Sequence, residues 1–253
     1  MPIGLPLIAS HQKRIILWSH PRSRSTAFER AFIEREDCYV VHEPTSLALY
    51  FGQEITDIMR ALECVGRAPL PHVLSDVCYR TPHSHHVFIK DFAYHCASHL
   101  SDQFLSQFKH VILVRKPEET IRSFHAIHPD FQVWEVGYHE LYWLARRLRS
   151  LGHAPVLVDA QQLVDTPQEI MKSVCEWTGL PFSPAMINWK HREVMPSWER
   201  WDRFHKVALE SRILGGISVK EREPALIPKR AGLIHYLEPI YEAIFNEFAT
   251  LIR

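Results

Sequence analysis

Five short apolar runs dominate the sequence, and helical patterns separate them. Each run is four to six residues long, which is the length of a buried strand and too short for a typical helix. Such runs alternating with amphipathic helices are typical of a parallel sheet that helices cover on both faces. We therefore expect an α/β fold with three layers and a mostly parallel central sheet of about five strands. The expected strands are residues 14–19, 38–41, 86–90, 110–114 and 155–158.

One helical pattern has clear ends. Asp165 or Thr166 is the expected N-cap, Pro167 begins the helix, and Gly179 follows its last residue at Thr178. Proline favours the first turn and glycine favours the position just past the end. The other helices are expected at 26–35, 94–108, 117–126, 134–150 and about 233–252, with a loop over 213–228 before the last.

Length and charge limit the classes of protein that the chain can belong to. A chain of 253 residues, 46% of them hydrophobic, can bury one substantial core. We expect a single domain over 1–253, with its core at about 14–190 and a helical C-terminal extension over 191–253. Lys plus Arg equals Asp plus Glu at 29 each, so no overall positive field favours a nucleic acid or an anionic membrane. No apolar run approaches the roughly 20 residues that cross a bilayer, and a cytoplasmic protein is expected.

The cysteines and histidines do not form a recognisable metal motif. The five cysteines include no CxxC pair, which argues against a disulfide framework or a cysteine zinc site and favours buried thiols. His83, His85 and His86 form a local cluster, but no carboxylate or cysteine stands at ligand spacing beside them. A solvated loop is therefore favoured over a metal site.

The first expected strand leads through a hydroxyl-rich turn into a helix, and this arrangement binds anions. Successive backbone N–H groups and the positive helix end point at one place. Ser23, Ser25 and Thr26 add hydroxyl groups and Arg22 adds a charge. The alternative is that Ser23 or Ser25 only caps the helix, with Arg22 and Arg24 as surface charges. The turn lacks GxxxxGK[ST], and with it the lysine and the magnesium-holding hydroxyl of ATP and GTP enzymes.

The turn resembles the first loop of the sulfotransferase family, which reads Pro-Lys/Arg-Ser-Gly-Ser/Thr-Thr. It stands here as Pro21-Arg22-Ser23-Arg24-Ser25-Thr26. The resemblance implies that this loop holds the 5′-phosphosulfate of 3′-phosphoadenosine 5′-phosphosulfate, and that Arg22 stabilises the leaving phosphate. Arg24 departs from the family, which usually has glycine there. If that position needs a positive φ, an arginine is strained.

A second segment resembles the family's 3′-phosphate element, a strand that ends in arginine with a serine eight residues later. Arg115 follows the fourth expected strand, Pro117 opens the next helix, and Ser123 stands at the matching spacing. The resemblance implies that Arg115 and Ser123 hold the 3′-phosphate. An arginine and a serine at this spacing are a weak signal alone, but in order after the first loop they are fairly specific. The resemblance covers about residues 14–190.

Sulfuryl transfer also needs a base for the acceptor proton, and it needs no metal. Glu43 follows the second expected strand, where some sulfotransferase subgroups resembling this chain use a glutamate. Cytosolic members use a Lys-x-His element instead, and here Lys90 is present while Phe92 stands at the histidine position. His95 comes three residues later and can still reach a cleft. We favour Glu43 over His95 as the base; the alternatives are a solvated turn carboxylate and a core histidine. Lys90 either supports the phosphosulfate or bonds nearby carbonyls.

The resemblance therefore implies a P-loop-like fold and a sulfotransferase that moves a sulfuryl group to a hydroxyl or amine of a small-molecule acceptor. One rival is a kinase-like P-loop enzyme acting on a small metabolite. The other is a catalytically inactive nucleotide-binding protein of the same fold, which Arg24 keeps open. Ala27 stands where cytosolic members have an adenine-stacking tryptophan, and the residues 229–232 are only a loose match to their late cofactor element.

Overall fold

A five-stranded parallel sheet forms the centre of the computed structural model, which describes residues 12–46, 49, 85–190, 198, 202–215 and 228–248. The strand order is β2-β3-β1-β4-β5, and every neighbouring pair is parallel. All five expected strands are confirmed, with ends that shift by at most two residues. The strands are β1 Arg14–Ser19, β2 Cys38–His42, β3 His86–Phe92, β4 Lys109–Val114 and β5 Val156–Asp159.

The helix expected at 167–178 is confirmed at both ends. Pro167 begins it, and Gly179 ends it in the left-handed conformation with φ 77. Thr166 precedes it, but its side chain makes no capping hydrogen bond. The described helices, with 3-10 turns labelled η, are α1 Ser25–Ile33, α5 Ala93–Cys96, η2 Ala97–His99, α6 Asp102–Leu105, α7 Pro117–Ile127, η3 Val133–Val136, α8 Tyr138–Ser150, α9 Gln162–Asp165, α10 Pro167–Thr178, η4 Pro184–Met186, α11 Asp202–Glu210 and α12 Pro228–Phe248.

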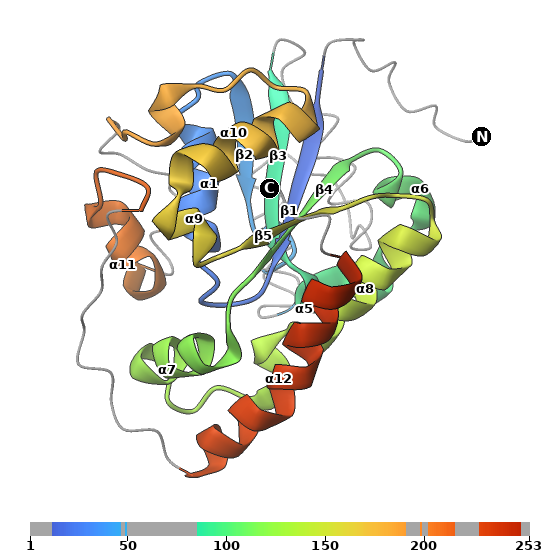
Figure 1. The fold of residues 1–253 in the computed structure, drawn as a ribbon, viewed down its shortest axis with the longest axis vertical. Helices are drawn as coiled ribbons and strands as arrows, with labels where there is room; N and C mark the ends of the chain where they lie inside the picture. Colours follow the sequence, from blue (N-terminus) through green and yellow to red (C-terminus); the bar gives the residue numbers. More distant parts are fainter. Residues whose placement is uncertain are drawn as a thin grey trace.

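Helices cover both faces of the sheet because its central strand is apolar on both. Successive side chains of a strand point to opposite faces, so Ile16 and Trp18 join one buried cluster while Ile15 and Leu17 join the other. Figure 1 shows α1, α9 and α10 on one side of the sheet and α5, α8 and α12 on the other. The expected three-layer α/β arrangement is confirmed.

The single helix expected over residues 94–108 is wrong. The chain forms α5 and η2, becomes extended at Leu100, and begins α6 only after Ser101. The hydroxyl of Ser101 accepts a hydrogen bond from the backbone N–H of Phe104. Because a serine cap satisfies one of the free N–H groups at a helix start, it stabilises the break.

Two other helix predictions need correction at their starts. The helix expected over 134–150 is divided, because Gly137 takes a left-handed conformation between η3 and α8. The last helix begins at Pro228, five residues earlier than expected, and residues 249–253 lie outside the described part of the chain. Of the expected loop over 213–228, residues 216–227 lie outside it as well. Helix α11 lies within the expected helical extension over 191–253, although the sequence analysis gave no bounds for it.

The described helices include none with both the length and the apolar composition that crossing a bilayer requires. Cys96 and Cys175 are buried free thiols and Cys38 is half-buried. Cys64 and Cys78 lie outside the described residues, as does His83 of the histidine cluster.

Candidate active site

A cleft of about 420 Å³ opens at the carboxyl ends of the strands. Ligands of parallel α/β sheets bind at this edge. The walls come from the loop after β1, the residues after β2 and β3, and helices α7 and α11. Of the predicted site residues, Arg22, Arg24, Ser25, Thr26, Glu43, His95, Arg115 and Ser123 line the cleft, whereas Ser23 and Lys90 are fully buried and do not.

The loop between β1 and α1 turns sharply in left-handed backbone. Arg22 has φ 63 and Arg24 has φ 70, a region that costs non-glycine residues about 1–2 kcal/mol. Helix α1 begins just after this turn, at Ser25, and the first N–H groups of a helix can bind an anion. Ser25 and Thr26 line the cleft. Ser23 instead donates its hydroxyl proton to the carbonyl of His20 at 2.7 Å and so braces the turn from within.

Arg22 joins the loop to two elements that are distant in sequence. Its Nε donates to the hydroxyl oxygen of Ser123 on α7 at 3.0 Å. Its Nη1 donates to the backbone carbonyl of Phe204 on α11 at 2.9 Å. The first loop and the arginine–serine segment, which the sequence treats as separate motifs, therefore meet in space.

Arg115 is held against the same loop. Its Nη1 donates to the carbonyl of Arg22 at 3.0 Å, and its Nε donates to the carboxylate of Glu119 at 2.8 Å. Its backbone N–H donates to Nε2 of His20 at 3.1 Å, so the other ring nitrogen of His20 carries the proton and donates to the Pro21 carbonyl. Burial lowers the pKa of His20 to about 3, and the ring stays neutral.

Arg24 occupies the position where the resembling family has glycine, and it does adopt a positive φ. Its Nη1 donates to the carbonyl of Ala160 at 2.6 Å and to the side chain of Gln161 at 3.1 Å, both just after β5. Its Nη2 lies 3.8 Å from the Glu119 carboxylate. The guanidinium thus spans from the loop to the far edge of the sheet.

Glu43 is tied to Lys90. The Lys90 ammonium, fully buried at the end of β3, donates to Oε1 of Glu43, and His42 Nε2 lies 3.8 Å from the same oxygen. Burial alone would raise the pKa of Glu43, but the charges of Lys90, His42 and His95 outweigh it and hold the pKa at about 2. The carboxylate is therefore ionised at neutral pH and a weak base.

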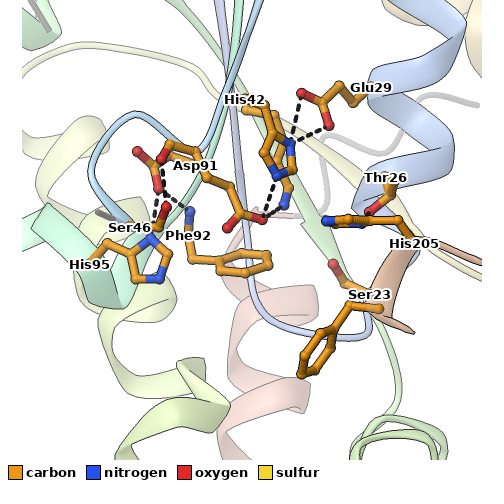
Figure 2. A network of polar contacts seen from close by, with 12 residues as sticks. Ser23, Thr26, Glu29, His42, Ser46, Asp91, Phe92, His95 and His205 are labelled. Atoms are coloured by element: carbon orange, nitrogen blue, oxygen red, sulfur yellow. Dashed lines mark hydrogen bonds and ion pairs between the residues drawn. The ribbon is translucent and has the colours of Figure 1, made fainter. Parts of the chain in front are cut away.

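His95 is oriented by a buried carboxylate. Its Nδ1 lies 2.8 Å from Oδ1 of Asp91, which is itself fully buried, and Figure 2 shows the two side chains facing each other. The other Asp91 oxygen accepts hydrogen bonds from the backbone and hydroxyl of Thr45 at 3.1 and 2.6 Å. An ionised carboxylate only accepts, so Nδ1 of His95 carries the proton and Nε2 has the lone pair in the neutral ring.

Two histidines in and beside the site, His42 and His205, were not predicted from the sequence. His42 Nδ1 lies 2.8 Å from the fully buried carboxylate of Glu29 on α1, and His205 of α11 lies 3.1 Å from the Thr26 hydroxyl (Figure 2). Burial, followed by the charges of His42 and Lys90, lowers the pKa of His205 to about 3. The helical spacing of Phe204 and Ala208 was the one signal that could have revealed α11.

The loosely matching residues 229–232 lie on α12 and away from the cleft lining. Arg230 donates to the carbonyls of Pro129 and Phe131 at 2.5 and 2.9 Å, and its guanidinium stacks 3.6 Å from the Phe131 ring. This arginine joins α12 to the segment after α7.

Comparison with known families decides the class. Residues 13–209 match the family model described as the sulfotransferase domain. The chain belongs to the sulfotransferase family. The matched segment includes every predicted site residue and α11 except its last residue, Glu210, so the family match extends beyond the 14–190 span of the sequence resemblance. The predicted family is confirmed, and so is the α/β fold with a parallel five-stranded sheet.

Relatives of this sulfotransferase carry different names. Branched-chain-amino-acid aminotransferase-like proteins 2 and 1 of Arabidopsis thaliana are 28% and 29% identical over 87% of this chain. The match covers 38% of each, so the sulfotransferase chain spans less than two fifths of their length. Among solved structures, the sulfotransferase domain of the Synechococcus PCC 7002 olefin synthase is similar over 91% of this chain and 97% of its own, with 16% identity and a TM-score of 0.49.

Proposed function

We propose that this chain transfers a sulfuryl group from 3′-phosphoadenosine 5′-phosphosulfate to a hydroxyl or amine of a small-molecule acceptor. One observation carries the proposal: Arg22 and Arg115 follow different strands but line the same cleft. The guanidinium of Arg115 donates a hydrogen bond to the backbone carbonyl of Arg22. A ligand with phosphate at both its 5′ and 3′ positions needs two such cationic groups in one cleft. A nucleoside 5′-phosphate would need one.

The residues of the cleft suit this co-substrate. Its volume of about 420 Å³ is in the range of small-ligand pockets. The α1 N-terminus with Ser25 and Thr26 would hold the 5′ group, and Arg115 with Ser123 would hold the 3′-phosphate. When bound, the co-substrate supplies the sulfuryl group, and its 5′-phosphate is the leaving group.

Arg22 would stabilise the charge that develops on the departing phosphate. Its guanidinium is fixed by neutral hydrogen-bond acceptors at Ser123 and Phe204, so it is oriented before the reaction begins. A cation oriented in advance avoids reorganisation in the transition state and can contribute several kcal/mol, about 3–4 for one donor.

We assign the proton-accepting role to His95 rather than to Glu43, which the sequence favoured. The His95 tautomer that Asp91 selects leaves Nε2 with a lone pair, and the ring lines the cleft. The Glu43 carboxylate, whose pKa is about 2, is a weak base for an acceptor proton. Glu43 then serves to neutralise and orient Lys90.

Differential stabilisation by nucleotides tests the proposal. We expect 3′-phosphoadenosine 5′-phosphate to raise the melting temperature of the purified protein much more than ATP with magnesium does. At a hundred times its Kd the bisphosphate should add about 2.7 kcal/mol to the free energy of unfolding. Equal stabilisation by the two nucleotides, or more by ATP, would overturn the proposal and favour the kinase-like rival.

The inactive rival is distinguished by chemistry. Arg24, with its left-handed backbone at the usual glycine position, is the observation that favours it. A single-turnover assay with a sulfate-labelled donor across a panel of alcohols, phenols and amines separates the two. Labelled product from any acceptor excludes an inactive protein, and binding of the donor without product across the panel supports it.

A further inference from the structure

Two arginines that line the cleft, Arg24 and Arg115, both lie near one carboxylate oxygen of Glu119. Oε2 of Glu119 lies 2.8 Å from Nε of Arg115 and 3.8 Å from Nη2 of Arg24. Glu119 is on α7, Arg115 follows β4, and Arg24 is in the loop after β1. Three separate segments thus meet at this oxygen, and one of them carries the residue that departs from the family pattern.

Glu119 occupies the Nε–H of Arg115, which is one of the donors on the side of the guanidinium that can bind a phosphate in parallel. A guanidinium binds a phosphate best when two parallel N–H donors are available. In Arg115, Nε is bonded to Glu119 and Nη1 to the carbonyl of Arg22. A carboxylate that stayed on Nε would also repel the negative charge of a phosphate beside it. A 3′-phosphate that binds through the Nε side of Arg115 would therefore displace Glu119, which then needs another partner.

Arg24 is built to be that partner. Its Nη1 is anchored on the carbonyl of Ala160 and the side chain of Gln161, which presents Nη2 to Glu119. The 3.8 Å separation is one small side-chain movement from a hydrogen bond. Burial lowers the pKa of Arg24 most, and the charge of Arg115 lowers it further, whereas the charge of Glu119 raises it. Arg24 therefore gains from a closer carboxylate.

We infer that Arg24 is a positioning residue for the 3′-phosphate: it takes Glu119 as its ion-pair partner and so leaves the Arg115 fork available to the ligand. The inference rests on the proposed function and goes beyond it, since it assigns a role to a residue that breaks the family motif. This role also explains why an arginine stands at position 24 although its φ of 70 is strained and a glycine would avoid that strain.

Four proteins test the inference: wild type, Arg24→Gly, Glu119→Gln and the double variant. Glycine accepts the left-handed backbone of position 24, so Arg24→Gly is expected to fold. Calorimetry measures the affinity of each protein for 3′-phosphoadenosine 5′-phosphate and for adenosine 5′-phosphate. We expect Arg24→Gly to lose about 10-fold in affinity for the bisphosphate and less than about 2-fold for the monophosphate, as befits one charged interaction.

The double variant provides the decisive comparison. If Arg24 acts by holding Glu119, then adding Glu119→Gln to Arg24→Gly removes the competing carboxylate and restores the affinity for the bisphosphate. If Arg24 instead contacts the ligand or only shapes the loop, Arg24→Gly causes the same loss whether or not Glu119 is replaced, and the inference is overturned. An unchanged affinity in Arg24→Gly overturns it as well.

A second substitution tests the inference if Arg24→Gly does not fold. Comparison with the monophosphate distinguishes a failure of the proposed function from a failure of the role assigned to Arg24. Arg24→Gln keeps an anchor for Ala160 without a positive charge, and it should show the same loss and the same rescue. A wild-type protein that binds both nucleotides equally would overturn the proposed function itself. A wild-type preference for the bisphosphate that Arg24→Gly retains would overturn only the role of Arg24.

Discussion

The guanidinium of Arg115 donates to the backbone carbonyl of Arg22 across 3.0 Å, although 93 positions separate the two residues. The first follows β4 and the second follows β1, and these strands are neighbours in the sheet. Adjacent parallel strands bring their carboxyl ends together, so the two segments that we propose bind phosphate line one cleft. This contact is the arrangement that a single ligand with two phosphates requires.

Removal of the Arg115 side chain should affect one end of the nucleotide only. We expect Arg115→Ala to weaken binding of 3′-phosphoadenosine 5′-phosphate about 10- to 100-fold, as the loss of a charged hydrogen bond implies, and to change adenosine 5′-phosphate binding little. Arg122→Ala is the matched control, since Arg122 lies on α7 and pairs with the exposed Glu118. Equal losses for both nucleotides would contradict a 3′-phosphate role.

Replacement of the proposed base should slow catalysis without weakening donor binding. We expect His95→Asn to lower kcat by roughly 10²- to 10⁴-fold, the usual contribution of a general base. Asp91→Asn should also lower kcat, because it no longer selects the tautomer of His95. Single-turnover kinetics with the donor's Kd measured in parallel checks both. A His95→Asn enzyme of normal rate would return the role to Glu43.

The buried ion pair of Glu43 and Lys90 should matter for stability. We expect Glu43→Gln to cost about 3–5 kcal/mol in the free energy of unfolding, because it leaves a buried ammonium without its counter-charge. Glu118→Gln, at an exposed pair, should cost less than about 1 kcal/mol. Chemical denaturation of both variants measures the difference, and similar costs would mean that water reaches Lys90.

The Glu43 carboxylate should also make the free energy of unfolding depend on pH. Its folded pKa of about 2 lies below the ordinary value of 4.5, so its contribution to stability is present above about pH 4.5 and is lost as the pH falls toward 2. In Glu43→Gln this acid-induced loss should be smaller. If the stability of Glu43→Gln falls below pH 4.5 as steeply as that of wild type, the prediction is wrong. Denaturation at several pH values measures both proteins.

His110 should add sensitivity to milder acid. Nδ1 of its ring accepts from Trp18 Nε1 at 3.1 Å, and Nε2 donates to the Leu105 carbonyl at 2.9 Å. Burial lowers its pKa from 6.5 to about 3, so the unfolded chain binds a proton first and stability falls as the pH drops from 6.5 to 3. We expect His110→Gln to reduce this slope by up to about 1.4 kcal/mol per pH unit, measured by denaturation at several pH values. An unchanged slope would show that His110 ionises within the fold.

Substitution of Gly137 should affect both the stability of the fold and the shape of the cleft. A Cβ at this position would lie 2.9 Å from Cδ1 of Tyr94, which lines the cleft. Gly152 has a similar positive φ but nothing within 4 Å of such a Cβ, so Gly152→Ala measures the backbone strain alone. We expect Gly137→Ala to be less stable than Gly152→Ala by about 1 kcal/mol or more and to raise the KM for the acceptor. Equal melting temperatures would indicate that Tyr94 moves aside freely.

The strands were predictable because a strand buried on both faces must be continuously apolar. In runs such as 14–19 and 110–114, most residues are apolar, so the strand can be recognised from the sequence of the run itself. The helix breaks were harder to predict, since the helical spacing of apolar residues continues through Ser101 and Gly137. At those two positions a local cap and a left-handed glycine ended the helices, and the sequence prediction weighted the spacing instead.

The two segments that we predict to bind anions, and their order along the chain, could be recognised from the sequence alone, because each is a local run of residues at a strand end. Which side chains pair was decided by the tertiary structure. Lys90 neutralises Glu43, Asp91 orients His95, and α11 supplies Phe204 to Arg22, since burial and charge act between groups that only the packed sheet brings into contact.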